Sequence, residues 1–592
     1  MQQQHPSAWL DSFENGQYQA SWRFDLPVGV LEARVPDQVV AVFDEVEKAT
    51  QRGLYAVGFV AYEAAHALNP HLPPLLPQAG LPLVWFCLFK ERRPAAAAKG
   101  LPKPSRSVLR LEPTRSQADY LQAVTAIHQA IELGETYQIN YTFPLEGPWV
   151  GDPLQVYRSL LDRQRPAFGA LLETGSHTII STSPELFFSL RNGVIVTRPM
   201  KGTAPRGRFS AEDLTLADQL RQSPKERAEN LMIVDLLRND LGRIAVTGSV
   251  RTERLFEVAS YPTVHQMIST ISARLQPETG LVDIFRALFP CGSVTGAPKR
   301  RSMEIIARLE QQPRGIYCGA IGYLAPEGEC CFSVAIRTLL LDHGTGRTSM
   351  GVGSGVTWGS EPMAEYVECL TKATFLQQAD QPRLLESLLQ VDGGYPWLEQ
   401  HLERLCWSAG RLGYACDRQR IRQQLFEHAS CENGRQKTRL LLAADGGFQI
   451  NSSALQPLQE PLRIAVSAQP VDPNDPMLYL KTEQRERYEK ARQENPDADE
   501  VLLCNRQGKL TEGSFTNLVL NLDGTLLTPP LTCGLLPGVL RQQLLAQGTI
   551  SEQVLCPADL LRADEIWLIN SVRGWLRGEL LPATLNRLSA VQ

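Results

Sequence analysis

A single break in the periodic pattern, at residues 377–383, most constrains how this chain can fold. The stretch reads QQADQPR; a long helical pattern ends there and Pro382 follows. The chain has 592 residues, which is too many for one hydrophobic core, so at least two domains are expected. We therefore predict a first domain over residues 1–377, a linker over 378–383 and a second domain over 384–592.

Composition favours two ordinary globular domains acting on small molecules. Hydrophobic residues make up 43% of the chain and charged residues 21%. The net charge of -5 does not favour binding to nucleic acid or to an anionic membrane surface. The start MQQQHPSAWLDSF has no basic or apolar leader, and no apolar run approaches about 18 residues. We expect a cytoplasmic protein with no membrane and no nucleic acid partner.

The 12 cysteines carry no CxxC or Cys/His spacing typical of a zinc site, so free, reduced thiols are predicted. No Gly-x-Cys-x-Gly elbow occurs, so the sequence shows no glutaminase nucleophile of its own. Residues 91–107 combine Pro, Gly, Ala and basic residues, which predicts a solvated connection inside the first domain.

One acidic helix can be predicted over residues 223–237. Ser223 suits the N-cap, Pro224 suits the first turn, and Glu226 completes a Ser-x-x-Glu capping box. Glu226 and Glu229 then share one helical face, where two like charges repel unless a cation lies between them. Alternatively, Glu226 serves only as a cap.

A second acidic helix is predicted to open at Ser360 and Pro362 and to carry Glu365, Glu368 and Lys372. Here the alternative is that Glu368 only pairs with Lys372. Two carboxylate pairs on separate helices suit Mg²⁺, which takes one or two protein carboxylates and completes its octahedron with water and substrate oxygens.

The first domain resembles the chorismate-utilising enzymes, the family of anthranilate, aminodeoxychorismate, isochorismate and salicylate synthases. The segments that carry the resemblance are TRPMKGT (197–203), SPELF (183–187), KERAENLMIVDLLRNDLGR (225–243), FPCGSVTGAPKRRSMEII (289–306), RGIYCGAIGY (314–323), AIRT (335–338), GVGSGV (351–356) and SEPMAEYVECLTK (360–372). The resemblance implies an α+β fold of two packed antiparallel sheets flanked by helices.

It also implies roles for particular residues. Lys201, when uncharged, would attack C2 of chorismate, and Glu185 would protonate the departing C4 hydroxyl. Glu185 would need a raised pKa to stay protonated. Glu229 and Glu368 would bind Mg²⁺ directly, and Glu226 and Glu365 directly or through water. The chorismate pocket would be lined by Thr203, Tyr317, Arg337, Gly353 and Gly355; a guanidinium suits a carboxylate, and glycines let backbone N–H groups approach an anion.

Three positions discriminate within the family. The residue before Gly-Thr is usually alanine in anthranilate synthases and lysine in aminodeoxychorismate synthases, and here it is Lys201. Gln138 stands where isochorismate and salicylate synthases have a lysine that activates water. Gln266, beside His265, stands where anthranilate synthases show a histidine linked to pyruvate elimination. The resemblance therefore implies amination of chorismate without elimination.

The second domain resembles the class IV, fold-type IV pyridoxal phosphate enzymes, which include transaminases and aminodeoxychorismate lyase. The matching segments are HLERLCWSAGRLGY (401–414), YLKTEQRERYEKAR (479–492), ADEVLLCNRQGKLTEGSFTNLVL (498–520), CGLLPGVLRQ (533–542) and INSVRGW (569–575). A two-lobed fold is implied, with an abbreviated small lobe. The implied cofactor residues are Lys481 as the Schiff-base lysine, Glu512 for the pyridine nitrogen, and Arg404, Gly538, Val539 and Ser571 for the phosphate.

The tetrapeptide LLES at 384–387 is similar to the tryptophan-regulatory motif of anthranilate synthases, but it lies in the wrong domain. Together the resemblances imply a fusion that makes 4-amino-4-deoxychorismate and then removes its pyruvate to give 4-aminobenzoate. Ammonia would come from a separate glutamine amidotransferase subunit or from free ammonium, and the second domain implies a homodimer. The alternatives are an anthranilate synthase fused to a transaminase-like domain, or a fusion with one catalytically silent scaffold half.

Overall fold

The computed structural model describes residues 6–13, 21–94, 109–376, 382–429 and 434–589. Two compact units result: Met1–Ala204 with Ala217–Ala379, and Pro205–Leu216 with Asp380–Gln592. The segment Pro205–Leu216 groups with the second unit because Phe209 packs on Tyr479, with ring centroids 5.6 Å apart. Most of the predicted connection at 91–107 and of the predicted linker at 378–383 lies outside the described residues.

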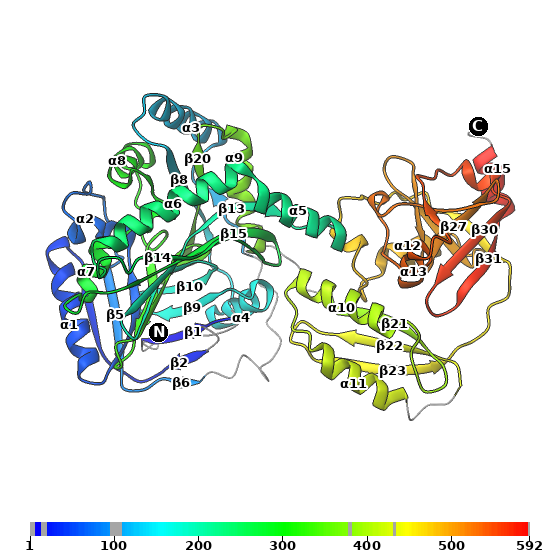
Figure 1. The fold of residues 1–592 in the computed structure, drawn as a ribbon, viewed down its shortest axis with the longest axis horizontal. Helices are drawn as coiled ribbons and strands as arrows, with labels where there is room; N and C mark the ends of the chain where they lie inside the picture. Colours follow the sequence, from blue (N-terminus) through cyan, green and yellow to red (C-terminus); the bar gives the residue numbers. More distant parts are fainter. Residues whose placement is uncertain (1–5, 14–20, 95–108, 377–381, 430–433, 590–592) are drawn as a thin grey trace. The chain divides into compact units, whose positions relative to one another are not determined.

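The first unit contains two ten-stranded sheets, and the strand pairs with a defined register are antiparallel (Figure 1). The first sheet has the order β16 (Gly296–Ala297), β8 (Gln138–Pro148), β20 (Arg347–Thr357), β19 (Thr338–Asp342), β10 (His177–Ser183), β9 (Phe168–Glu173), β1 (Ser7–Asp11), β2 (Trp22–Phe24) and β6 (Arg93–Pro94), with β7 (Glu112–Pro113) paired to β8. The second has the order β13 (Met200–Pro205), β15 (Val264–Arg274), β12 (Val194–Arg198), β11 (Leu186–Arg191), β18 (Cys330–Val334), β17 (Ala320–Leu324), β4 (Tyr55–Val60), β5 (Val84–Phe89) and β3 (Pro27–Ala33), with β14 (Arg251–Ser260) paired to β15.

Helices cover the outer face of each sheet. The first sheet carries α3 (Gln117–Glu132), α4 (Pro153–Gln164), α8 (Lys299–Glu310) and α9 (Pro362–Thr371), and the second carries α1 (Val39–Gln51), α2 (Ala65–Leu68), α6 (Pro224–Gly242) and α7 (Leu281–Leu288). Between the sheets lies a third core, which joins β1, β9 and β10 to β4, β5 and β17. The predicted fold of two packed antiparallel sheets flanked by helices is confirmed.

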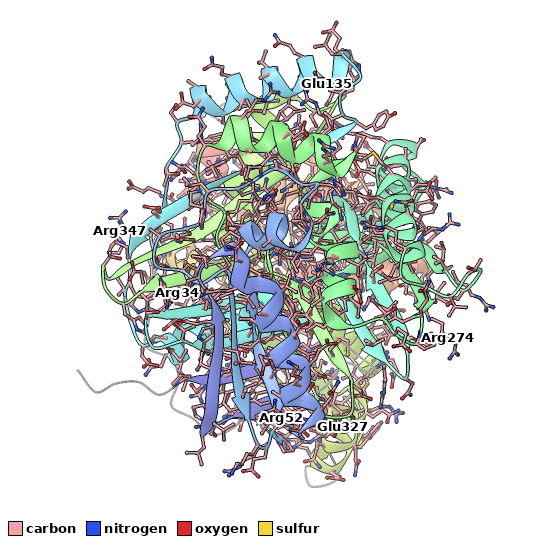
Figure 2. The ribbon with its side chains drawn as sticks, turned by 90° about the vertical axis from the view of Figure 1, so that its left-hand side faces the viewer. Arg34, Arg52, Glu135, Arg274, Glu327 and Arg347 are labelled. Carbon is pink, nitrogen blue, oxygen red and sulfur yellow. The ribbon has the colours of Figure 1, made fainter. Side chains whose placement is uncertain are left out.

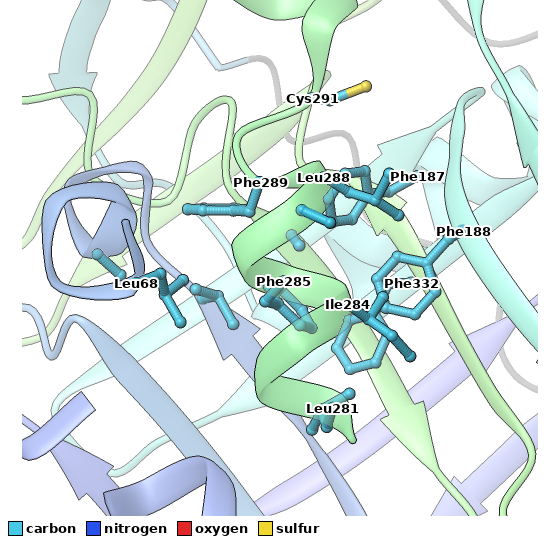
Figure 3. Packing of buried hydrophobic residues seen from close by; sticks show 14 of the residues in the cluster. Leu68, Phe187, Phe188, Leu281, Ile284, Phe285, Leu288, Phe289, Cys291 and Phe332 are labelled. Atoms are coloured by element: carbon cyan, nitrogen blue, oxygen red, sulfur yellow. The ribbon is translucent and has the colours of Figure 1, made fainter. Parts of the chain in front are cut away.

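Aromatic side chains form the core beneath α7. Phe285 meets Phe332 edge to face with centroids 5.3 Å apart, and Phe187 and Phe188 pack around it (Figure 3). Edge-to-face pairs add to the free energy of apolar burial. This packing holds β11, which follows Glu185 directly, against the helices of the second sheet.

Charged side chains such as Arg274 and Arg347 point outward from the first unit (Figure 2). None of the helices in the described ranges is long and apolar enough to span a bilayer.

The second unit has two lobes. The small lobe is an antiparallel sheet of β21 (Leu384–Gln390), β22 (Gln436–Leu442) and β23 (Phe448–Ala454), covered by α10 (Leu398–Leu412) and α11 (Arg418–Ala429). The large lobe is a mixed sheet in the order β26 (Leu510–Gly513), β25 (Glu500–Cys504), β24 (Leu462–Val466), β31 (Gly574–Leu580), β30 (Glu565–Asn570), β27 (Asn517–Leu522), β28 (Thr525–Thr528) and β29 (Ser551–Glu552). It carries α12 (Glu486–Gln493), α13 (Val539–Ala546), α14 (Asp559–Arg562) and α15 (Pro582–Ser589); α5 (Ser210–Gln222) begins in the inserted segment. The predicted two-lobed fold is confirmed.

The two predicted acidic helices form, with corrected ends. Helix α6 continues beyond residue 237 to Gly242 because Leu241 is buried in the core. Ser223 caps α6, its hydroxyl accepting from the Glu226 amide at 3.4 Å. The predicted capping box is wrong in its second half: the Ser223 amide donates to the Leu220 carbonyl and not to Glu226, so the Glu226 carboxylate is left to face the cavity described below.

The helix predicted to open at Ser360 and Pro362 begins at Pro362, and Ser360 lies outside it. Glu361 caps α9, and its carboxylate accepts from the amides of Met363 and Ala364 at 3.1 and 2.6 Å. The Ser360 hydroxyl instead accepts from the Thr357 amide at 3.0 Å. Two carboxylate–amide bonds stabilise the helix start more than one hydroxyl would.

Candidate active sites

The first unit contains a cavity of about 220 Å³ between β13, β20, α6 and α9. All eleven residues predicted for the first domain line it: Glu185, Lys201, Thr203, Glu226, Glu229, Tyr317, Arg337, Gly353, Gly355, Glu365 and Glu368. They come from strands and helices separated by up to 183 residues of chain. Folding has therefore assembled one candidate site from them.

Lys201 extends from β13 across the backbone of β20. A Cβ atom added at Gly355 would lie 2.0 Å from the Lys201 Nζ atom, which is far too close for any side chain. The lysine backbone is fixed from α6, because Asn230 Nδ2 donates to the Lys201 carbonyl at 3.2 Å. Asn230 is fully buried and accepts from Ser269 Oγ at 2.6 Å. Gly355 therefore leaves the space that the lysine amine occupies.

Asn230 and Ser293 belong to the site and were not predicted from the sequence. A polar residue at a core position of an amphipathic helix is the signal that could have indicated Asn230. Ser293 lies in segment 289–306, which carries part of the family resemblance, and it donates from Oγ to Glu185 Oε1 at 2.7 Å.

Glu185 is almost completely buried, with 2% of its surface exposed. Burial raises its pKa to about 7, although Ser293 and the Met200 amide donate to the carboxylate and oppose that shift. A carboxyl group with this pKa can hold a proton near neutrality and give it to a leaving group.

The four glutamates face the cavity from two helices. Burial and the nearby charge of Glu229 raise the pKa of Glu226. The pKa of Glu368 is lowered, because Lys372, whose Nζ lies 2.8 Å from Glu368 Oε1, outweighs burial. Glu368 thus both pairs with Lys372 and lines the cavity.

These carboxylates fit a magnesium ion as an incomplete set of ligands. Within the described part of the chain, no three acidic, His or Cys side chains converge into a preformed metal cluster. Mg²⁺ commonly keeps several water ligands and takes only one or two protein carboxylates. Mutual repulsion at Glu226 and Glu229 would be relieved by such a cation.

Arg337 and Tyr317 also line the cavity. Burial lowers the pKa of the Arg337 guanidinium, whose NH1 donates to the neutral Gln164 side chain at 3.3 Å. Among the described residues no carboxylate pairs with Arg337, so an anionic ligand would satisfy it. A Cβ at Gly351 would meet the Tyr317 ring at 2.1 Å, and one at Gly353 would meet Thr142 at 2.6 Å, so packing alone accounts for both glycines.

The discriminating glutamines lie beside Lys201. Gln266 Nε2 donates to the Gly202 carbonyl at 2.9 Å, and Thr203 Oγ1 donates to Gln266 Oε1 at 3.1 Å. His265 is buried and hydrogen-bonds Ser260 Oγ at 2.9 Å. Because alternate strand residues point to opposite faces, Gln266 and not His265 reaches the cavity.

Gln138 lies beside Gly355 of β20. It is fully buried, and neither atom of its amide has a hydrogen-bond partner among the described residues. A Cβ at Gly355 would lie 3.1 Å from its Nε2. An unsatisfied buried amide beside a cavity is costly unless a ligand or water completes it.

The second unit contains a cavity of about 900 Å³. It is lined by all six residues predicted to hold the cofactor: Arg404, Lys481, Glu512, Gly538, Val539 and Ser571. Its volume is within the usual range of small-molecule sites.

Lys481 is held in place through its backbone, whose carbonyl accepts from the Leu385 amide of β21 at 2.8 Å. Burial and the positive charge of Arg404 lower the pKa of the Lys481 amine to about 8. A lowered pKa leaves a useful fraction of the amine uncharged and nucleophilic near neutral pH.

Glu512 and the start of α13 provide the other features of the site. Glu512 accepts from Tyr488 OH at 2.7 Å and from the Leu536 amide at 3.1 Å, and burial raises its pKa to about 7. Gly538 caps α13, and a Cβ there would lie 1.8 Å from Asn517 Oδ1. These groups fit pyridoxal phosphate, an anionic cofactor with a basic ring nitrogen. The Glu512 acid suits the ring nitrogen, the Lys481 amine suits the aldehyde, and the start of α13 at Gly538 suits the phosphate.

Glu386 and His401, which form a hydrogen-bonded group with Arg404, were not predicted. Glu386 accepts from Arg404 Nε at 2.9 Å and NH2 at 2.6 Å, and it lies 2.7 Å from His401 Nδ1. Arg404 NH1 donates to the Pro537 carbonyl at 2.9 Å. The LLES segment thus supplies a buried carboxylate that orients Arg404, and the i,i+3 spacing of His401 and Arg404 was the available signal.

The cavity also carries unpredicted cations. Lys437 and Arg439 come from β22, and Arg485 and Arg573 come from the large lobe. Burial and the charges of the three arginines lower the pKa of Lys437. A cavity with this many positive charges favours a ligand with more than one anionic group.

Comparison with known proteins agrees with this architecture. Residues 9–378 match the family of chorismate binding enzymes, and residues 383–579 match amino-transferase class IV. The chain is 43% identical over 257 residues to aminodeoxychorismate synthase component 1 of Klebsiella aerogenes, covering 43% of this chain and 56% of that protein. It is 43% identical over 276 residues to aminodeoxychorismate synthase of Streptomyces griseus, covering 46% of this chain and 38% of that protein. These matches thus span about half or less of each relative.

The fold is also similar to solved structures. Anthranilate synthase component I from Streptococcus pneumoniae TIGR4 superposes with a TM-score of 0.54 and 25% identity, covering 62% of this chain and 93% of that one. The two-sheet unit is thus shared by enzymes that perform different reactions, so the reaction must be argued from the side chains of the site.

Proposed function

The chain belongs to the chorismate-binding enzyme family and continues into a class IV aminotransferase region, and from this premise we propose that it makes 4-aminobenzoate in two steps. The first unit would aminate chorismate to 4-amino-4-deoxychorismate, and the second would release pyruvate from that product. The observation that carries the first step is the Lys201 amine, for which Gly355 leaves space in the cavity that Glu185 also lines.

In the first step, Lys201 Nζ attacks C2 of chorismate and the C4 hydroxyl leaves as water with a proton from Glu185. Ammonia then adds at C4, and the bond between Lys201 and C2 breaks. The raised pKa of Glu185, about 7, supports its role as the acid. Arg337 would bind a substrate carboxylate, and Mg²⁺ held by Glu226, Glu229, Glu365 and Glu368 would neutralise another.

Gln138 and Gln266 support amination over the family's other reactions. A glutamine amide cannot activate water as a lysine amine can, which disfavours hydroxylation at Gln138. Gln266 holds the turn after Lys201 through two neutral hydrogen bonds, and a neutral amide has no proton-transfer role in eliminating pyruvate.

In the second step, Arg404, Ser571 and the amides at the start of α13 would hold the phosphate of pyridoxal phosphate, and Glu512 would face its ring nitrogen. The cofactor, when bound, supplies an electron sink for charge that develops at C4. Lys481 would take the C4 proton and the bond between C3 and the ether oxygen would break, so that the ring becomes aromatic. The enolpyruvate that leaves would take up a proton at its methylene carbon to become pyruvate. Lys437, Arg439 and Arg573 would bind the two substrate carboxylates.

The component 1 relatives support a separate glutamine amidotransferase subunit as the source of ammonia. A homodimer through the second unit remains a prediction, and light scattering during gel filtration would test it.

A product assay tests the proposal directly. The purified chain would receive chorismate, Mg²⁺, pyridoxal phosphate and ammonium, and chromatography would separate 4-aminobenzoate, anthranilate and aminodeoxychorismate. We expect 4-aminobenzoate and pyruvate from the natural sequence, accumulated aminodeoxychorismate from Lys481→Ala, and neither product from Lys201→Ala. Anthranilate as the main product would overturn the assignment of Lys201.

A further inference from the structure

Two cysteines of the second unit lie close enough to react with each other. The Sγ atoms of Cys406 and Cys416 are 3.4 Å apart. Cys406 belongs to α10, and the chain reverses beyond that helix at Gly413, where φ is +74°. The Tyr414 amide donates to the Ala409 carbonyl at 2.7 Å, which fixes the returning segment that carries Cys416.

The two thiols are partly accessible and chemically different. Both are half-buried and free in the structure. The hydrogen bond from Cys416 lowers the pKa of Cys406 to about 7, and the positive charge of Arg418 acts in the same direction against partial burial. The same hydrogen bond raises the pKa of Cys416. The lowered pKa favours the thiolate of Cys406, which is the form that reacts with oxidants.

We propose that Cys406 and Cys416 form a redox modification site, which a peroxide converts into an intramolecular disulfide. The Cys406 thiolate attacks one peroxide oxygen, the O–O bond breaks, and the other oxygen leaves as water, so that Cys406 becomes a sulfenic acid. The Cys416 sulfur then attacks the Cys406 sulfur, the S–O bond breaks, and a second water leaves. Two thiols are oxidised to one disulfide, and the peroxide is reduced to two waters.

This site is separate from both cavities. Neither cysteine lines them, although Cys406 follows Arg404 by two residues on α10. The cross-link would join the C-terminal half of α10 to the segment that follows it. The proposal therefore stands or falls independently of the reaction proposed above.

Peptide mapping provides a test that needs no activity. Trypsin cuts after Arg404, Arg411 and Arg418, so Cys406 and Cys416 fall in separate peptides, 405–411 and 412–418. The folded full-length protein would be treated with hydrogen peroxide, its remaining thiols alkylated, and its digest analysed without reduction. We expect these two peptides to be joined with the loss of two hydrogens and to separate after reduction.

Serine variants provide the controls. Cys406→Ser and Cys416→Ser should each abolish the joined peptide, whereas Cys504→Ser should leave it unchanged. Cys504 is a matched control because it is also half-buried, but burial raises its pKa to about 11. Phenylarsine oxide, which bridges neighbouring thiols, should protect both peptides of the reduced protein from alkylation. Sulfinic acid at Cys406 without joined peptides, or a cross-link between two chains, would overturn the proposal.

Discussion

Replacing Gly355 with alanine should disable the first reaction without unfolding the protein. The added Cβ would lie 2.0 Å from Lys201 Nζ, whereas folded proteins essentially never bring a Cβ within 3.0 Å of another heavy atom. The amine must therefore move by about 1 Å, a displacement that can cost on the order of 100-fold in rate. Because the obstructed atom ends a flexible side chain, and alanine is less costly than glycine in a strand, we expect stability to change by no more than about 1 kcal/mol.

The assay would follow chorismate consumption with saturating ammonium and Mg²⁺, together with thermal unfolding. Gly359→Ala is the matched control, because a Cβ at Gly359 meets nothing within 4 Å. Full activity in Gly355→Ala, or an equal loss of activity in Gly359→Ala, would refute the claim that Gly355 leaves the space for the lysine amine.

Burial raises the pKa of Glu185 from 4.5 to about 7, so the folded protein keeps a proton that the unfolded chain releases in this window. The stability that this group contributes is present below pH 4.5 and is lost as pH rises through about 7. Between acid and mildly alkaline pH, the free energy of unfolding of Glu185→Gln should therefore rise by about 3 kcal/mol relative to that of the natural sequence. Equal pH profiles of the two proteins in denaturant titrations would contradict this prediction. Chelation of Mg²⁺ should stop amination but leave conversion of supplied aminodeoxychorismate intact, and loss of both activities would contradict separate sites. Lys481→Ala should lose the visible absorbance of covalently held pyridoxal phosphate, whereas Lys437→Ala should keep it and raise KM for the substrate; an unchanged KM would count against Lys437 as a carboxylate ligand.

Local sequence patterns predicted two domains and supplied the residue types that could carry chemistry. Glu226 and Glu229, and likewise Glu365 and Glu368, share a helical face because they are three residues apart, and that relation is local. Ser223 and Pro224 mark a helix start for equally local reasons. The ordered motifs around Lys201 and Lys481 indicated both folds through their resemblance to known families.

The contacts between these groups depend on the tertiary structure. Lys201 lies against Gly355, 154 residues away, and Glu185 meets Ser293, 108 residues away. The pairing of strands selects Gln266 over His265, and α6 supplies Asn230 through a core position that helical periodicity would assign to an apolar residue. Such contacts, and the burial that raises the pKa of Glu185, depend on how sheets and helices pack over long sequence separations. That packing is a property of the whole core, which no local pattern contains.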